Sequence, residues 1–170
     1  MAARDDVAEN TAKEIVIERV FDAPRECVFE AFTRAEHLQQ WWGPAMVTVP
    51  VAEFEARAGG RLFFAERAPD GAMVYIAGVV REIEPPTRLV IAIHFADASK
   101  RRVAPPSRSG LPGNWQGEIV ATVLFGADGQ RTRVTVRQSL SSVTAEWGEG
   151  ARQGWGESLE KLGAALARMR

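Results

Sequence analysis

Side chains that could carry out chemistry are few in this chain and do not fall into a familiar catalytic spacing. The nitrogen and sulfur ligands are His37, His94 and Cys27, and no two of them are close in the sequence. A zinc site needs three or four such ligands, and nucleotide-binding loops need glycine-rich fingerprints that are absent here. The sequence therefore predicts neither a metal nor a cofactor. Cys27 would begin a short helix with no histidine nearby, so a nucleophilic thiol is only a minor alternative.

Acid–base chemistry has three candidates, Glu66, His94 and Tyr75. Glu66 shares one strand face with Leu62 and Phe64, because residues two apart in a strand point the same way. If that face is internal, burial raises the pKa of the carboxyl, as is typical of functional acids. The nearby strand end favours an exposed Glu66 instead. For His94 the favoured interpretation is a packed imidazole within a strand.

Large apolar side chains that could line a cavity are more plentiful than one helix packed on one sheet needs. They coincide with a glycine- and alanine-rich segment near the C-terminus, which would leave space for a ligand. We predict a ligand site from these side chains, with a few polar groups to orient the ligand. Its members are Trp42, Met46, Phe54, Phe64, Met73, Tyr75, His94, Trp115, Trp147, Ala151, Trp155 and Leu159. The alternative is that each aromatic residue is simply part of the core.

The C-terminal stretch, residues 144–170, must position much of this site. Apolar residues recur there at steps of three and four, which predicts an amphipathic helix. They are Trp155, Leu159, Leu162, Leu166 and Met169. Glu157 and Lys161 lie four apart on the opposite face and are predicted to form a solvated ion pair.

Towards its start the same stripe continues through Ala151 and Gly148, and the segment also contains Gly150 and Gly154. Two interpretations remain open. In the first, residues 146–150 are a loop and the helix begins near Ala151. In the second, the small residues lie in the helix and leave space between helix and sheet for a ligand.

The remaining elements are predicted from alternating apolar residues and from turn sequences rich in Gly, Pro and Asp. Two short helices follow the first strand, the second over Ala35–Gln40, and they end at the Trp41-Trp42-Gly43-Pro44 stop. The predicted strands are Glu14–Phe21, Val47–Arg57, Arg61–Arg67, Met73–Ile83, Arg88–Phe95, Gln116–Phe125 and Thr132–Leu140. We predict an α+β fold in which a curved antiparallel sheet of about seven strands wraps around the long C-terminal helix.

One connection, Ala96–Trp115, is longer than is usual in a compact domain. Its Lys100-Arg101-Arg102 run favours a solvated loop tip over a binding patch. Trp115 at its end is expected to pack onto the body of the protein.

Composition matches an ordinary globular protein, with 46% hydrophobic and 25% charged residues and a net charge of −1. This charge does not favour nucleic acid, and no apolar run approaches the roughly 20 residues of a membrane span. A single cysteine suggests a reducing compartment, so we expect a cytoplasmic protein. We expect residues 1–13 to be a disordered tail and residues 14–170 to form one domain. The sequence leaves a homodimer open.

A set of short motifs, in order along the chain, resembles the family similar to activators of the heat-shock protein 90 ATPase. They include Phe21-Asp22-Ala23-Pro24-Arg25-Glu26, Trp41-Trp42-Gly43-Pro44, Pro69-Asp70-Gly71, Glu82-Ile83-Glu84-Pro85-Pro86-Thr87-Arg88-Leu89 and Gly154-Trp155. The resemblance implies a START-like helix-grip fold around a hydrophobic cavity.

Three functions follow from this resemblance and from the residues. The first is binding of a small hydrophobic or aromatic molecule between the sheet and the C-terminal helix. The second is an enzyme of the polyketide-cyclase or hydrolase type with Glu66, His94 or Tyr75 as acid or base. The third is a chaperone-interacting module.

Overall fold

The computed structural model describes residues 14–109, 111–139 and 145–169, so the predicted tail at 1–13 lies outside the described residues. The strands are β1 Glu14–Phe21, β2 Thr48–Phe54, β3 Arg61–Arg67, β4 Met73–Glu84, β5 Arg88–Ala96, β6 Ile119–Asp128 and β7 Arg131–Ser139. The α-helices of this part of the chain are α2 Arg25–Thr33, α3 Ala35–Trp41 and α4 Ala145–Arg168. These elements confirm the predicted α+β class.

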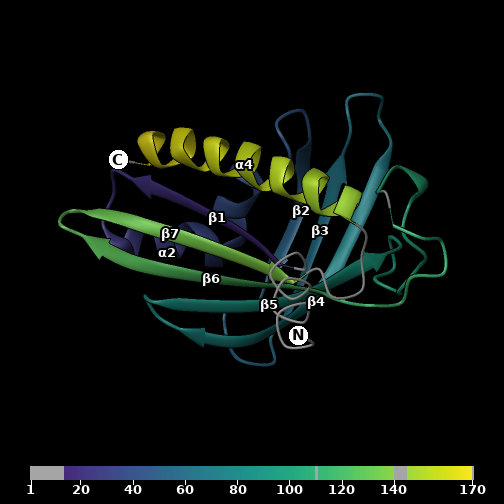
Figure 1. Ribbon diagram of the computed structural model, residues 1–170, viewed down its shortest axis with the longest axis horizontal. Coiled ribbons are helices and arrows are strands. Elements are labelled where there is room, and N and C mark those ends of the chain that lie inside the picture. The colour runs from purple at the N-terminus through teal and green to yellow at the C-terminus, as the bar shows by residue number, and fades with distance from the viewer. Residues whose placement is uncertain (1–13, 110, 140–144, 170) are drawn as a thin grey trace, which may run out of the picture.

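The seven strands form one antiparallel sheet in the order β1-β7-β6-β5-β4-β3-β2. In Figure 1 β6 and β7 lie along the long axis, whereas β2 and β3 stand steeply across it, so the sheet is strongly curved. Within β4 the register against β5 shifts between Val80 and Glu82. A bulge of this kind bends a strand and increases its twist. The long strand β4 thus passes from one orientation of the sheet to the other.

Helix α4 lies across the concave face of this sheet (Figure 1). Its predicted stripe is confirmed, because Leu159, Leu162 and Leu166 are buried in the same core cluster as the inward side chains of the strands. Helix α2 completes the core at the far end, where the rings of Phe29 and Phe32 each pack edge-on against Phe125 with 5.1 Å between centroids. All three helices therefore share one face of the sheet.

The start of α4 decides between the two interpretations of the small-residue segment. Residues 146–150 lie inside the helix, which begins at Ala145, so the loop interpretation is wrong. Several glycines in the first half do not prevent helix formation, because packing against the sheet outweighs their low helix propensity.

Two other predicted boundaries need correction. The β6–β7 turn contains only Gly129 and Gln130, because β6 continues to Asp128, which pairs with Arg131. Gly129 has φ +63°, a conformation that a tight hairpin requires and that glycine adopts without strain. Strand β2 ends at Phe54, since Glu55 already belongs to the turn: its N–H bonds the carbonyl of Arg61, and its carboxylate accepts the N–H of Arg61.

The connection from β5 to β6 contains a short 3-10 helix, η1 Ser107–Ser109. Each cation of its basic run is engaged locally: Lys100 pairs with Glu53, Arg101 with Asp97, and Arg102 lies over the Trp115 ring. The solvated-tip interpretation is thereby supported. Trp115 is buried in the main core, as expected.

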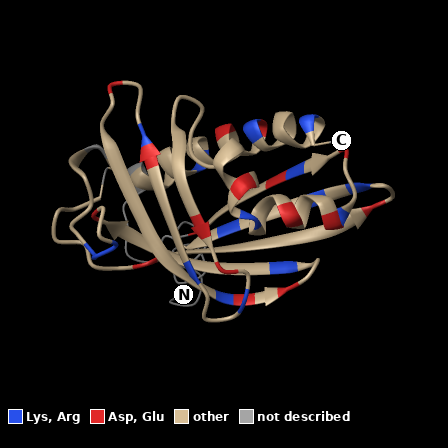
Figure 2. Ribbon diagram, turned by 180° about the vertical axis from the view of Figure 1, so that it is seen from behind, with Lys and Arg blue, Asp and Glu red and all other residues tan. Residues whose placement is uncertain are grey.

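Charged residues of both signs are interspersed over the strands and helices (Figure 2). No helix among the described residues is long and apolar enough to cross a membrane.

Candidate functional site

The two adjacent tryptophans at the end of α3, Trp41 and Trp42, have different surroundings. Helix α3 ends at Trp41, and the extended backbone of Trp42 followed by Gly43 at φ +86° turns the chain away. Trp41 is fully buried, and its Nε1 donates a hydrogen bond to the carbonyl of Ala31 at 2.8 Å. Trp42 instead forms part of a cavity wall. Its ring stacks on Phe64, with centroids 4.4 Å apart and planes at 14°.

That wall belongs to a cavity of about 400 Å³ between α4 and the concave face of the sheet, which we call the inner cavity. On the helix side, the wall of the cavity is formed by small residues. Gly150, Ala151 and Gly154 of α4 carry almost no side chain and so leave space in front of the helix. Trp147 and Trp155 lie on either side of these small residues and also line the cavity. The small residues thus leave the space that the second interpretation of the sequence required.

The opposite wall comes from the inward positions of three strands and from the long β5–β6 connection. Its apolar members are Val74, Ile76, Ile93, Phe95, Pro106 and Ile119. Polar groups in the lining are largely paired with protein atoms: the Nε1 of Trp155 donates to Gln138 Oε1 at 2.7 Å, and the Ser158 hydroxyl donates to the Gly154 carbonyl at 2.9 Å.

Glu66 is the exception, because it brings a carboxyl group to this mainly apolar lining. Its Oε1 accepts a hydrogen bond from Trp42 Nε1 at 2.9 Å. Burial raises the pKa of Glu66 to about 7, because the ionised form loses its hydration, while the Trp42 bond and the charge of Lys161 act in the opposite direction. The favoured sequence interpretation, an exposed Glu66, is therefore wrong. Its side chain follows Leu62 and Phe64 to the inner face.

The loop that carries Trp42, residues 42–47, is tied to α4 by two side chains. Lys161 Nζ donates to the carbonyls of Trp42, Gly43, Pro44 and Val47 at 3.2, 3.2, 3.1 and 2.9 Å. Glu157 Oε2 accepts the N–H of Ala45 at 3.0 Å. The predicted solvated ion pair between Glu157 and Lys161 is thus wrong, since both side chains serve this loop. We call this arrangement the loop clamp.

Comparison with known families matches residues 22–167 to the family described as Activator of Hsp90 ATPase homolog 1-like protein. The chain belongs to this family. No curated protein matches the chain.

Solved structures with the same fold come from several bacteria. A protein of this family from Silicibacter pomeroyi has a TM-score of 0.75 at 23% identity over 92% of this chain and 99% of that chain. A protein from Chromobacterium violaceum has a TM-score of 0.72 at 25% identity over 91% and 96%. A protein from Staphylococcus epidermidis has a TM-score of 0.75 at 24% identity over 93% and 92%. The predicted helix-grip, START-like fold is thus confirmed.

In this member of the family, only part of the predicted ligand site faces the inner cavity. Trp42, Trp147, Ala151 and Trp155 belong to its lining. Phe64 lies directly beneath Trp42, and Leu159 is buried in the core beside it. The interaction of these residues with a ligand stays a prediction.

The other predicted residues lie elsewhere for identifiable reasons. Tyr75 and His94 are on the convex face of the sheet, because they alternate with Ile76 and Phe95, which point inward. Met73 lies two residues before Tyr75 in the same strand, so its side chain points to the same face of the sheet. The prediction that these three face α4 is therefore wrong.

Met46, Phe54 and Trp115 are also absent from the lining of the inner cavity. Met46 is 72% exposed in the loop between α3 and β2. Phe54 packs against the core from the edge strand β2, and Trp115 fills the core below the β5–β6 connection. The site thus depends on residues that the sequence did not single out for it, such as Gln138 and Phe95.

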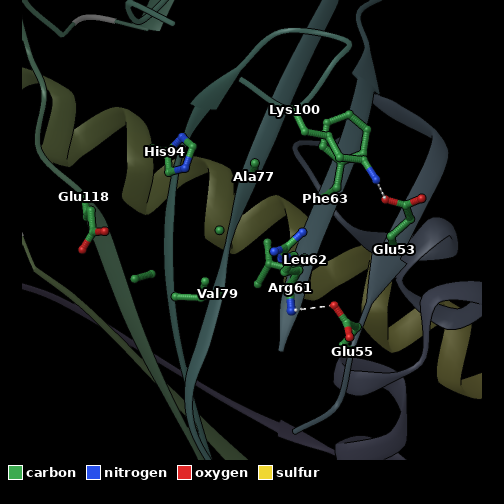
Figure 3. A pocket seen from close by; sticks show the side chains of 12 residues that line it. Glu53, Glu55, Arg61, Leu62, Phe63, Ala77, Val79, His94, Lys100 and Glu118 are labelled. Carbon is green, nitrogen blue, oxygen red and sulfur yellow. Dashed lines mark hydrogen bonds and ion pairs between the residues drawn. The ribbon is translucent and has the colours of Figure 1, made fainter. Parts of the chain in front are cut away.

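A second depression of about 650 Å³, the outer hollow, lies on the convex face of the sheet (Figure 3). His94 lines it, and the Phe63 side chain lies beside Lys100. Several of its charged groups form ion pairs at the surface: Lys100 with Glu53, and Glu118 with Arg81. The outer hollow therefore resembles an ordinary solvated sheet face, and the inner cavity, with its mainly apolar lining, is the better candidate site. Among the described residues no cluster could hold a metal ion.

Proposed function

We propose that this protein binds a small hydrophobic or aromatic molecule in the inner cavity, without a cofactor. The observation that carries the proposal is an open apolar space between α4 and the sheet, walled by Trp42, Trp147 and Trp155. Its volume of about 400 Å³ falls within the range typical of small-molecule sites. An apolar ligand there would remove its own surface and that of the indoles from water, at about 25 cal/mol per Å².

The test is binding of a neutral aromatic probe, 1-naphthylmethanol, measured by calorimetry and by the change in tryptophan fluorescence. Replacing Gly150 by Phe should abolish binding, because no atom lies within 4 Å of a Cβ built there and a ring would occupy the cavity. Replacing Trp155 by Ala should weaken binding by removing one wall.

The matched control is Ala164→Phe, which places the same ring on the exposed side of α4. It should bind the probe as the unchanged protein does. Failure of the unchanged protein to bind, or undiminished binding by both Gly150→Phe and Trp155→Ala, would overturn the proposal. Circular dichroism of each variant verifies that the fold is retained.

A second candidate function is acid–base catalysis, favoured by the position of the Glu66 carboxyl in the mainly apolar lining of the inner cavity, where burial raises its pKa to about 7. A carboxyl with such a pKa can accept and return a proton at neutral pH. His94 and Tyr75 cannot assist it from the convex face, so Glu66 would act alone.

Deuterium exchange distinguishes this second function from simple binding. A bound methyl ketone, 2-acetonaphthone in D₂O, should lose methyl protons to Glu66 and gain deuterium, as observed by NMR. Glu66→Gln should abolish the acceleration over buffer. Equal exchange with the unchanged protein, the variant and buffer removes the enzyme hypothesis.

A further inference from the structure

The charge pattern of the inner cavity narrows the class of ligand that it would hold. Among its described lining residues, Glu66 is the only one with an ionisable side chain. The remaining lining is apolar or carries neutral polar groups such as Gln138 and Ser158. A ligand in this cavity would therefore meet one carboxyl group in surroundings that screen charge poorly.

The two oxygens of this carboxyl differ in their contacts. Oε1 accepts the hydrogen bond from Trp42 Nε1, whereas no described residue donates to Oε2. The indole N–H groups of Trp42 and Trp155 are already engaged, by Glu66 and Gln138. On this side of the cavity, Oε2 of Glu66 is thus an acceptor without a donor from the described residues. A ligand that carries a hydrogen-bond donor would complement it.

No neighbouring cationic side chain of the protein forms an ion pair with the Glu66 carboxylate among the described residues. Lys161 is the positive group that acts on Glu66, but its ammonium donates to four carbonyls of the loop clamp. No described ion pair joins it to Glu66. Glu157, the other charged group on this side of α4, is engaged with Ala45 N–H and with the amide of Gln153. The carboxylate therefore lacks a directly bonded counter-ion.

The aromatic walls favour a cation at the same place. Trp42 lies within hydrogen-bonding distance of Glu66, and Trp155 meets the Trp42 ring edge-on at 5.8 Å between centroids. Indole faces attract ammonium groups, most strongly where water is excluded. A ligand carboxylate, in contrast, would be repelled by Glu66.

We propose that the ligand is a hydrophobic or aromatic amine, whose protonated nitrogen contacts Glu66 while its apolar body lies between Trp42, Trp147 and Trp155. This inference rests on the proposed function, because it assigns a ligand class to the same cavity. The ammonium would supply the counter-ion that the buried carboxylate lacks and the donor that Oε2 lacks.

The experiment compares three probes with the same ring: 1-naphthylmethylamine, 1-naphthylmethanol and 1-naphthylacetate. Calorimetry at pH 8 should show the amine binding about tenfold or more tightly than the alcohol, as expected for one charge-assisted contact. The carboxylate should bind more weakly than the alcohol. Near pH 6.5 the amine should release protons from Glu66 on binding, detected by repeating the titration in buffers of different ionisation enthalpy.

Glu66→Gln should lower the affinity for the amine to that for the alcohol and abolish the proton release. The alcohol should still bind, which shows that the variant is folded. The control Glu160→Gln removes an exposed carboxylate from α4 and should leave the preference intact. Equal affinity for the three probes, or an amine preference that survives Glu66→Gln, overturns the amine inference and leaves the proposed function standing. Absence of binding by all three overturns the proposed function.

Discussion

Burial of the Glu66 carboxyl next to the Trp42 indole costs the folded chain free energy whenever that carboxyl is ionised. The cost appears as the rise in its pKa from 4.5 to about 7. A leucine at the same place would have filled the lining without this cost. Retaining an acid there makes sense if a ligand uses it, and this is why the proposals above are centred on Glu66.

The first prediction is a pH dependence of stability due to Glu66. Because its pKa is raised in the folded chain, the folded state binds more protons than the unfolded state between about pH 4.5 and 7. Stability from this group is fully present below pH 4.5, is lost as the pH rises to about 7, and is level above that. The total loss should be about 3 kcal/mol.

Urea unfolding at pH 5 and pH 8 tests this prediction in the unchanged protein and in Glu66→Gln. The stability of the unchanged protein relative to the variant should be about 2–3 kcal/mol lower at pH 8 than at pH 5. Glu30→Gln, which removes an exposed carboxylate from α2, should show no such difference. A Glu66→Gln difference that does not vary with pH would contradict the raised pKa.

Between elements, the decisive contacts connect α4 to the loop that follows α3. The Lys161 ammonium meets four carbonyl oxygens within 3.2 Å. Burial lowers the pKa of Lys161, while the charges of Glu66 and Glu157 act in the opposite direction. The loop turns sharply at Gly43, and the carbonyl of Pro44 also accepts the N–H of Val47 at 3.0 Å. Lys161 bonds the four loop carbonyls from the helix, so Trp42 is held in the cavity wall.

The second prediction is that Lys161→Gln lowers the free energy of unfolding by about 1–3 kcal/mol, since hydrogen bonds from a charged donor are lost. Urea denaturation at pH 8 measures the change. Lys100→Gln is the matched control, because the Lys100 ammonium pairs with Glu53 at the surface and should contribute less than about 1 kcal/mol. Equal destabilisation by the two variants would mean that the loop clamp contributes no more than a surface pair.

The whole molecule depends on the curvature that allows one sheet to enclose α4 (Figure 1). Strands β4 and β5 approach so closely at Gly78 that a Cβ there would lie 2.1 Å from the carbonyl oxygen of Ala92. At Gly150, by contrast, the same addition meets no atom within 4 Å. One glycine is required by close packing, and the other leaves the inner cavity open.

The third prediction follows from this contrast. Gly78→Ala should lower the free energy of unfolding by about 3 kcal/mol or prevent folding, because β4 and β5 must separate. Gly150→Ala should raise it by about 0.5–1 kcal/mol, because alanine favours the helix interior. Thermal unfolding followed by circular dichroism compares the two. If Gly78→Ala lowers the free energy of unfolding by less than about 1 kcal/mol, β4 and β5 can separate at Gly78 at little cost.

Most of the fold could be predicted from the sequence, because its signals are local. Alternating apolar residues define strands such as β7, and turn residues separate the strands. The leucine stripe identified α4, although not its start, since several glycines obscured the first turns. Packing of Trp147 against the core outweighs the propensity of those glycines.

The candidate site was less accessible to prediction. Tryptophans near small residues indicated a cavity beside α4, and Glu66 lies two residues from Phe64, so the two were predicted to share a strand face. The sequence could not show that Trp42, 24 residues away, covers the carboxyl near the end of β3, so the strand end suggested exposure. It also could not separate Tyr75 and His94 from the cavity, because a period of two does not say which face of a strand is internal.

By itself, then, the sequence determined the order of elements, the curved sheet around a helix and the presence of large aromatic residues near a small-residue helix segment. Only the tertiary structure decided which side chains share the inner cavity and what pKa the Glu66 carboxyl has. The physical reason is distance along the chain: Lys161 lies 119 residues from Trp42, whose carbonyl it bonds. Contacts of that kind depend on how the sheet bends and on which face α4 covers, and no local pattern records either.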